Sequence, residues 1–335
     1  MKKYWIPLLL LLFIAADIFL GSVKLPFHQI WSSVWGGEAP DYVNKIVWNF
    51  RFPKMITALL SGMALAVCGV QMQTLFRNPL ADPYILGISS GAGLGVALFT
   101  MGFSAFGLNS LIPDAVADLG MASAAWIGAL AMTFIIMAAS QRLKSNMSLL
   151  ILGIMAGSAG SALIGLLQYL SNAPALKMYV LWTMGSFGNV TGSRLLIMAL
   201  LCLVGFTISF YNIKDLNVLL MGEQYAHSLG IRLNRVRNRI FIATALLAGS
   251  VTAFCGPIGF IGIAVPHLAR MIFRNANHRV LIPASGLIGA LLMLSADILS
   301  QMPGSQNTLP VNTVAALLGI PVIIYVIFQN KAIQE

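Results

Sequence analysis

Charged residues are scarce in this chain. Only 9% of its 335 residues are charged, whereas 58% are hydrophobic and the mean hydropathy is +0.85. A soluble domain keeps about 25% charged residues on its surface, so most of this surface is expected to face membrane lipid. A span needs about 20 apolar residues. The length therefore accommodates about ten spans in one domain, residues 1–335, and leaves no room for a large soluble domain.

Cysteine is scarce too, and no catalytic motif is present. Cys68, Cys202 and Cys255 are far apart in apolar stretches, which excludes a disulfide framework and a zinc site. The histidines lack the spacing of metal ligands, so no metal is expected. The phosphate-binding pattern G-x-x-x-x-G-K-[ST] is missing. We therefore expect a chain that is not an enzyme, binds no cofactor and does not hydrolyse ATP by that route.

Long apolar runs predict an all-helical polytopic membrane protein. The ten predicted spans are residues 5–21, 55–73, 84–101, 120–139, 148–170, 194–211, 240–255, 258–271, 281–300 and 310–328. The first follows Lys2 and Lys3 as a signal peptide would, but it lacks a small-residue cleavage site, so we interpret it as an uncleaved span. Several glycines and Pro257 interrupt the eighth.

The distribution of basic residues predicts the orientation. The net charge is +10, and the Lys and Arg residues lie between the apolar runs. With ten spans and the N-terminus inside, fourteen of the 20 basic residues fall on one side and six on the other. Cytoplasmic loops carry such an excess of positive charge. We therefore predict that both termini are cytoplasmic, and we do not expect a nucleic-acid partner.

Two segments resemble each other internally. Residues 57–79 and 244–266 share nine identities in 23 aligned positions, including Gly69 with Gly256 and Pro79 with Pro266. The two segments run in opposite directions in the predicted topology. An inverted repeat of this kind is a common plan of transporters.

Two carboxylates fall inside predicted spans. Charge in hydrocarbon is costly, and no Lys or Arg partner for Asp17 or Asp297 is evident, so we expect each to reach the interface or to bond a neighbouring helix. The alternative is an ion relay in an ion-coupled secondary transporter, for which one of these residues would be essential. A membrane-embedded enzyme would need clustered His, Asp or Ser at one membrane face, which is not found.

Two segments between spans stand out. Gln71 and Gln73 end an apolar helix that Asn78-Pro79 and Asp82-Pro83 then interrupt. Non-helical backbone at membrane depth is tolerated against protein or a water-filled cavity, so this is a candidate pathway element; an ordinary turn is the alternative. The loop 212–239 contains a short amphipathic helix, which suits a protein partner or the bilayer surface.

Several motifs together resemble the permease family that imports iron-siderophore complexes, haem and cobalamin. They are RFPK at 51–54, the broken segment 61–95, MGEQYAHSLGI at 221–231, CGPIGFIGIAVPHLAR at 255–270 and LPVNTVAALLGIPVIIYV at 309–326. The resemblance implies a homodimer in a bacterial inner membrane. It also implies two cytoplasmic ATPase subunits that bind ATP, an external substrate-binding protein and a cavity between the two permease subunits.

The resemblance also implies roles for individual residues. It implies that Arg51 and Lys54 dock the binding protein. It implies that the pathway and the cytoplasmic gate are formed by Gln71, Gln73, Asn78, Leu80, Asn146 and Met147. It implies that the ATPase is contacted by Glu223, Ala226, Leu229 and Gly230. Lys54 stands where the family usually has arginine, and Gln301 where the cobalamin permease has arginine. Thr308 and Asn312 also depart from the family pattern, without an assigned role. The sequence leaves the identity of the chelate open.

Overall fold

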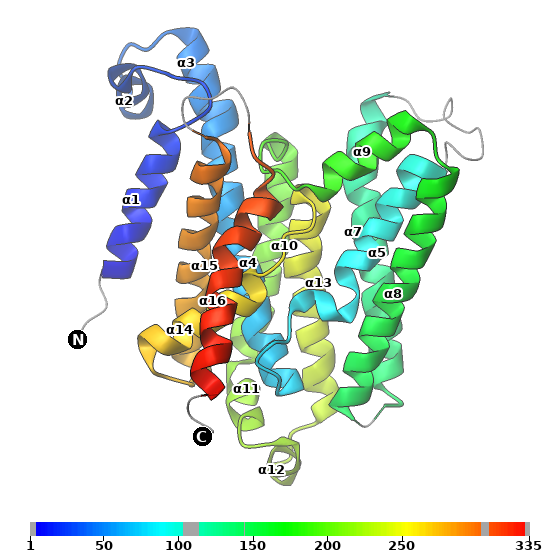
Figure 1. The fold of residues 1–335 in the computed structure, drawn as a ribbon. Helices are drawn as coiled ribbons and strands as arrows, with labels where there is room; N and C mark the ends of the chain where they lie inside the picture. Colours follow the sequence, from blue (N-terminus) through cyan, green and yellow to red (C-terminus); the bar gives the residue numbers. More distant parts are fainter. Residues whose placement is uncertain (1–4, 103–113, 144, 303–307, 332–335) are drawn as a thin grey trace.

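The computed structural model describes residues 5–102, 114–143, 145–302 and 308–331, and all regular structure in these ranges is helical (Figure 1). The first half contains α1 (Trp5–Phe19), α2 (Phe27–Trp35), α3 (Asp41–Ile46), η1 (Val47–Arg51), α4 (Phe52–Phe76), η2 (Pro83–Leu86), α5 (Ile88–Ala97), η3 (Leu98–Gly102), α7 (Asp114–Ser140) and α8 (Asn146–Leu170). The second contains α9 (Ala173–Thr183), α10 (Gly192–Tyr211), α11 (Ile213–Leu219), α12 (Glu223–Ser228), α13 (Leu233–Cys255), α14 (Ile261–Phe273), α15 (His278–Ser300) and α16 (Val311–Lys331).

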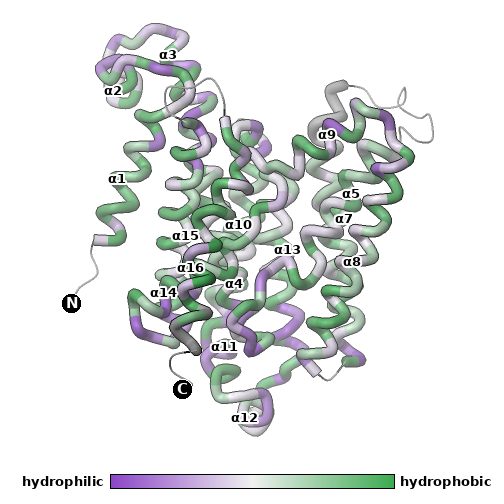
Figure 2. Tube along the Cα trace, in the orientation of Figure 1, coloured by the Kyte–Doolittle hydropathy of each residue, from purple (hydrophilic) through white to green (hydrophobic). Residues whose placement is uncertain are grey.

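The apolar helices confirm the predicted all-helical fold with about ten spans. In the described ranges, six are long and apolar enough to cross a membrane: those containing α4, α7, α8, α10, α13 and α15. Four shorter apolar helices, α1, α5 with η3, α14 and α16, match the remaining predicted spans. Figure 2 shows the hydrophobic stretches in the middle of the molecule, with hydrophilic residues concentrated near α2 and α3 at one end and near α12 at the other.

The structure corrects the predicted loop, which also contains α11, and adds short helices elsewhere. Helix α13 already begins at Leu233, so the loop ends near residue 232 and not at 239. No glycine or proline interrupts residues 233–239, and the helix continues through them into the span. Helices α2, α3 and α9 were missed because each is too short to span a membrane.

Glycines let the central helices approach closely. A Cβ atom on Gly69 would lie 1.8 Å from the carbonyl oxygen of Gly262, and one on Gly62 would lie 2.1 Å from that of Gly289. Real side chains do not fit at such distances, so α4 packs backbone to backbone against α14 and α15. In a membrane, where lipid is as apolar as the side chains, close van der Waals packing of this kind replaces the hydrophobic drive.

The two segments that resemble each other run in opposite directions, as predicted. Helix α4 runs from the α3 end towards the α12 end, and α13 runs back (Figure 1). Each is followed by a break and a shorter helix, at Arg77 (φ 49°) after α4 and at Gly256 (φ 80°) after α13. The hydroxyl of Tyr84 joins the two breaks, because it accepts from Thr252 Oγ1 at 3.2 Å and from the Ile258 N–H at 3.3 Å.

Candidate functional site

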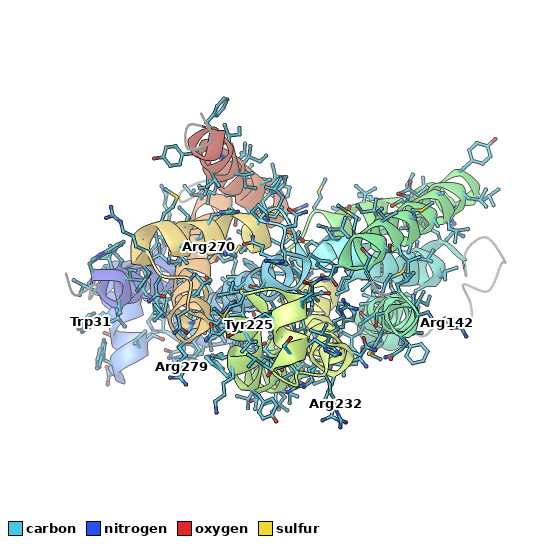
Figure 3. The ribbon with its side chains drawn as sticks, turned by 90° about the horizontal axis from the view of Figure 1, so that it is seen from below. Trp31, Arg142, Tyr225, Arg232, Arg270 and Arg279 are labelled. Atoms are coloured by element: carbon cyan, nitrogen blue, oxygen red, sulfur yellow. The ribbon has the colours of Figure 1, made fainter. Side chains whose placement is uncertain are left out.

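The short helix α12 presents an apolar surface at one end of the molecule. Gly222 (φ 112°) precedes it and Gly230 (φ 79°) follows it, both in backbone conformations that favour glycine. Met221, Tyr225 and Leu229 are 68%, 47% and 57% exposed. Figure 3 views this end, and Tyr225 lies near its centre. An exposed apolar cluster of this kind suits a protein partner.

The predicted coupling residues do not all lie on that surface. Leu229 and Gly230 are exposed, but Ala226 is 0% exposed and packs inside the protein. The assignment of the Ala226 side chain to the ATPase surface is therefore corrected. Helical spacing explains the difference, because Tyr225 and Leu229 are four residues apart and share a face that Ala226 does not.

Glu223 joins α12 to the membrane helices. Its carboxylate accepts from Arg237 Nη2 of α13 at 3.1 Å and forms a short hydrogen bond with Asn146 Nδ2 at the start of α8. The same Asn146 amide donates to the Leu75 carbonyl near the end of α4, at 2.8 Å. A predicted coupling residue and a predicted gate residue are thus in direct contact. The Glu223 carboxylate bonds α12 directly to α8 and α13, and Asn146 extends the linkage to α4.

Arg237 is the ion-pair partner of Glu223, and it was not predicted from the sequence. Its side chain is 4% exposed, so the ion pair with Glu223 is largely shielded from water on this side. A signal was present in the sequence, because Arg237 is four residues before Phe241 and seven before Thr244 on the buried face of α13. An arginine on an apolar helix face requires a partner.

The broken segment after α4 forms a capped turn. Asn78 Oδ1 accepts from the Leu80 N–H at 2.9 Å, and His267 Nε2 of α14 donates to the Pro79 carbonyl at 2.8 Å. Leu80 is 44% exposed. Of the other predicted gate residues, Met147 is 65% exposed at the first turn of α8. These two side chains are thus exposed, and the role of the predicted residues as a gate stays a prediction.

The two glutamines mainly join helices. Gln71 is fully buried and donates to Ser209 Oγ of α10 at 2.9 Å. Gln73 donates to the Ile263 carbonyl at 3.3 Å and accepts a short hydrogen bond from Arg270 Nη2, and it borders a cavity of about 510 Å³ at the α12 end. In this conformation, Gln71 therefore faces a neighbouring helix and not an open pathway. The pathway role of the two glutamines stays a prediction.

A groove of about 600 Å³ runs between the two breaks and α8. It is lined by Tyr84, Ser90, Gly157 and Ser158 together with apolar groups of α8 and α14. Asp82 borders it and accepts from the Tyr84 N–H at 2.8 Å. Burial raises the pKa of Asp82 to about 6, and the Tyr84 N–H opposes this rise. The groove is mostly apolar with a few hydroxyl groups.

The opposite end of the molecule carries a second polar cluster. Arg51 is only 7% exposed and donates to the carbonyls of Ile18, Phe19 and Val23 at 2.7, 3.1 and 2.7 Å. The last carbonyls of a helix have no partner within it. Arg51 therefore caps the end of α1, and its guanidinium is not free on the surface.

Lys54 forms the ion pair that the sequence did not reveal. Its Nζ atom lies 2.9 Å from Asp297 Oδ1, and Gln301 Nε2 bridges the two carboxylates, at 3.2 Å from Asp17 Oδ1 and 3.0 Å from Asp297 Oδ2. The expectation that the span carboxylates lack a basic partner is therefore wrong for Asp297. The expectation that they bond neighbouring helices is confirmed for both.

Comparison with known proteins relates this architecture to a family of transport proteins. The model of the FecCD transport family matches residues 8–329. The hemin transport system permease protein HmuU of Yersinia pestis is 38% identical over 93% of this chain and 90% of its own, and the vitamin B12 import system permease protein BtuC of Serratia proteamaculans is 35% identical over 98% and 94%. A solved metal-chelate type ABC transporter in an inward-facing conformation has a TM-score of 0.83 and 27% identity, over 97% of this chain and 98% of its own.

The fold and these similarities define a class, the transmembrane permease subunits of ABC transporters. The chain belongs to the FecCD transport family.

Proposed function

We propose that the chain is the permease of a binding-protein-dependent ABC importer that carries an iron chelate, such as siderophore-iron or haem, or cobalamin across the bacterial inner membrane. The contact of Glu223 with both Asn146 and Arg237 carries the proposal, because it bonds an exposed apolar helix to three spans. A channel that worked alone would have no use for such a linkage.

Energy would reach the spans through α12. We place an ATPase subunit against Met221, Tyr225 and Leu229, which are exposed. ATP binding would close two such subunits on each other and move each α12 as a rigid body. Glu223 would pass this motion to α8 and α13, and no covalent bond to the substrate would be formed.

The groove between η2, α8 and α14 would be half of the pathway. Figure 3 shows α8 and α16 projecting from the same edge of the molecule, and residues of α8 line the groove. A second copy of the chain facing this edge would close the groove into a conduit. Mostly apolar walls with a few hydroxyls suit a bulky organic chelate, and the relatives named above carry hemin and vitamin B12.

The orientation and the external partner follow from charge. Arg142, Arg232, Arg270 and Arg279 all appear on the α12 end (Figure 3), and an excess of basic residues marks the cytoplasmic side. The start of α1 and the end of α16 lie towards this side in Figure 1. We therefore place the substrate-binding protein at the α2–α3 end, where Lys54, 21% exposed, could exchange Asp297 for an acidic side chain of the partner.

The test is reconstitution of the permease in vesicles with and without its ATPase and binding protein. Uptake of hemin, a ferric siderophore or cobalamin should require both partners and ATP. Accumulation by the permease alone under a proton or sodium gradient would contradict the proposal and support the ion-coupled alternative. The ligand that co-purifies with the binding protein identifies the chelate.

A further inference from the structure

A cavity of about 530 Å³ opens at the foot of α10, away from the proposed pathway. Its walls come from α10, α11, α13 and α15 and include Phe210, Tyr211, Lys214, Asp215, Arg239 and Arg279. In Figure 3, Arg279 lies at the edge opposite to the one from which α8 and α16 project. The cavity therefore faces the surroundings of a dimer and not its centre.

The charges in the cavity do not balance. Arg239 is neutralised by Asp215, with 3.0 Å between Nη2 and Oδ2, and its guanidinium also lies 5.1 Å from the centre of the Tyr211 ring. The side chains of Lys214 and Arg279 are exposed, and no described residue forms an ion pair or side-chain hydrogen bond with either. The cavity thus has an excess of two positive charges.

The position of Arg279 adds to this excess. It lies in the first turn of α15, where the Asn277 side chain already caps the Arg279 N–H at 2.9 Å. The start of a long helix carries partial positive charge, so a cation there is unfavourable by itself and an anion is favoured. The cavity is therefore suited to a negatively charged group.

The surroundings indicate that this group belongs to a lipid. Above the cavity, the outer face of α10 is apolar, with Leu200 and Leu203 exposed by 53% and 62%. Phe210 and Tyr211, 48% and 72% exposed, end this face next to the cations. Aromatic residues of this kind gather at the level of the lipid headgroups, and an acyl chain could follow the face of α10.

We propose that this cavity binds the phosphate group of an anionic phospholipid, through Lys214 and Arg279, with the acyl chains against α10. Basic pockets between spans on the cytoplasmic side are suited to such headgroups. The Arg239–Asp215 pair, with Arg239 5.1 Å from the centre of the Tyr211 ring, lines the cavity beside these two cations. The proposal rests on the proposed function in two respects, namely that the α12 end is cytoplasmic and that a second copy of the chain would face the edge of α8 and α16.

The experiment compares lipid retention in two variants with the same charge change. The full-length protein is placed in bilayers of phosphatidylcholine with added phosphatidylglycerol, and bound phosphatidylglycerol is counted by native mass spectrometry. Lys214→Gln with Arg279→Gln should lower phosphatidylglycerol affinity about 25-fold, because each of the two cations that contact the bound phosphate is expected to contribute about fivefold. Arg142→Gln with Arg274→Gln, also exposed at this end, should change it less than about twofold.

Three outcomes would overturn the proposal. Equal loss in both double variants would mean diffuse attraction to the membrane. Binding of inorganic phosphate to the detergent-purified protein, in competition with phosphatidylglycerol, would mean a site for a small anion. Loss of ATPase binding in neutral detergent on changing Lys214 and Arg279 would assign the cavity to the ATPase interface.

A conservative exchange controls for folding. Lys214→Arg with Arg279→Lys keeps both charges and should retain phosphatidylglycerol even if the glutamine variant fails to fold. Loss of retention in this charge-preserving variant, with an unchanged unfolding temperature, would contradict a phosphate site built on charge. Because lipid retention needs neither ATPase nor substrate, this result is independent of the transport test.

Discussion

The polar clusters at the two ends of the molecule engage their charges in different ways. At the α2–α3 end, Arg51 and Lys54 bond to α1 and α15, and the contacts join helices that lie side by side. At the α12 end, Glu223 also bonds inward, but the helix that carries it keeps its apolar face exposed. The first cluster fastens spans together, whereas the second connects spans to an exposed surface that a partner could move.

The difference shows that a charge near a span end is not by itself a docking group. Arg51 fits the expected docking motif in sequence, yet three backbone carbonyls occupy its guanidinium. A buried helix end must satisfy its carbonyls before any partner is bound. Contact with a partner is better indicated by exposed side chains beside a bonded anchor, as Leu229 lies beside Glu223.

The largest expected effect comes from reversing the charge at the α12 end. Glu223→Arg removes the acceptor of Asn146 and places a second cation beside Arg237. ATP-driven uptake should fall about 100-fold, which corresponds to about 2.7 kcal/mol of lost coupling. The protein should remain folded in the membrane. Uptake in reconstituted vesicles, with unfolding followed separately, measures both.

Asn234→Arg is the matched control for this variant. Asn234 is exposed at the same end, and this variant introduces the same arginine side chain with one unit of added charge, without removing the acceptor of Asn146 and Arg237. It should transport as the unmodified protein does. If Glu223→Arg transports equally well, α12 does not transmit the work of the ATPase.

A smaller effect is expected from breaking the ion pair at the other end. Lys54→Met leaves Asp297 buried without its cation and should destabilise the protein by about 2 kcal/mol, since the lysine is partly exposed. Adding Asp297→Asn should recover part of this loss. Denaturant unfolding of the single and double variants in detergent measures these changes in the free energy of unfolding. Lys45→Met, on exposed α3, is the control, and an equal loss there would refute the pair as a fastening contact.

The smallest effect concerns capture of the binding protein. Neutralising Arg51 and Lys54 together should weaken capture about fivefold at low salt and less at high salt. The salt-dependent part should come from Lys54, which is 21% exposed, because screening reduces the attraction of an exposed charge, whereas Arg51 is buried. Affinity measurements over a salt series test this. A loss of the same size at every salt concentration would mean that the two residues act only by holding α1 and α15 in place.

Much of the fold could be predicted because the sequence pattern that specifies each span lies within the span itself. Each apolar run of span length forms a helix, since backbone groups in lipid must be satisfied within their own segment. The breaks at Pro79 and Pro83 and the glycines around α12 are equally visible in sequence. Short helices such as α2 and α9 have no such pattern in the sequence. Neither is long enough to span a membrane or to show helical periodicity over several turns.

The site was predicted less completely because its contacts join distant segments. Glu223 and Asn146 were each chosen for separate reasons, and only the structure brings them together with Arg237. Lys54 and Asp297 likewise come from spans far apart in the chain. Helix register decided that Ala226 faces inward, and a loop of unknown register cannot reveal this.

The sequence by itself determined that the chain lies in a membrane as a helical bundle, because apolar length and the demands of the backbone leave no other arrangement. The tertiary structure decided which charges meet and which stay exposed. That outcome depends on how the helices pack and face one another, and close contacts such as Gly69 against Gly262 fix this packing across nearly two hundred residues of chain.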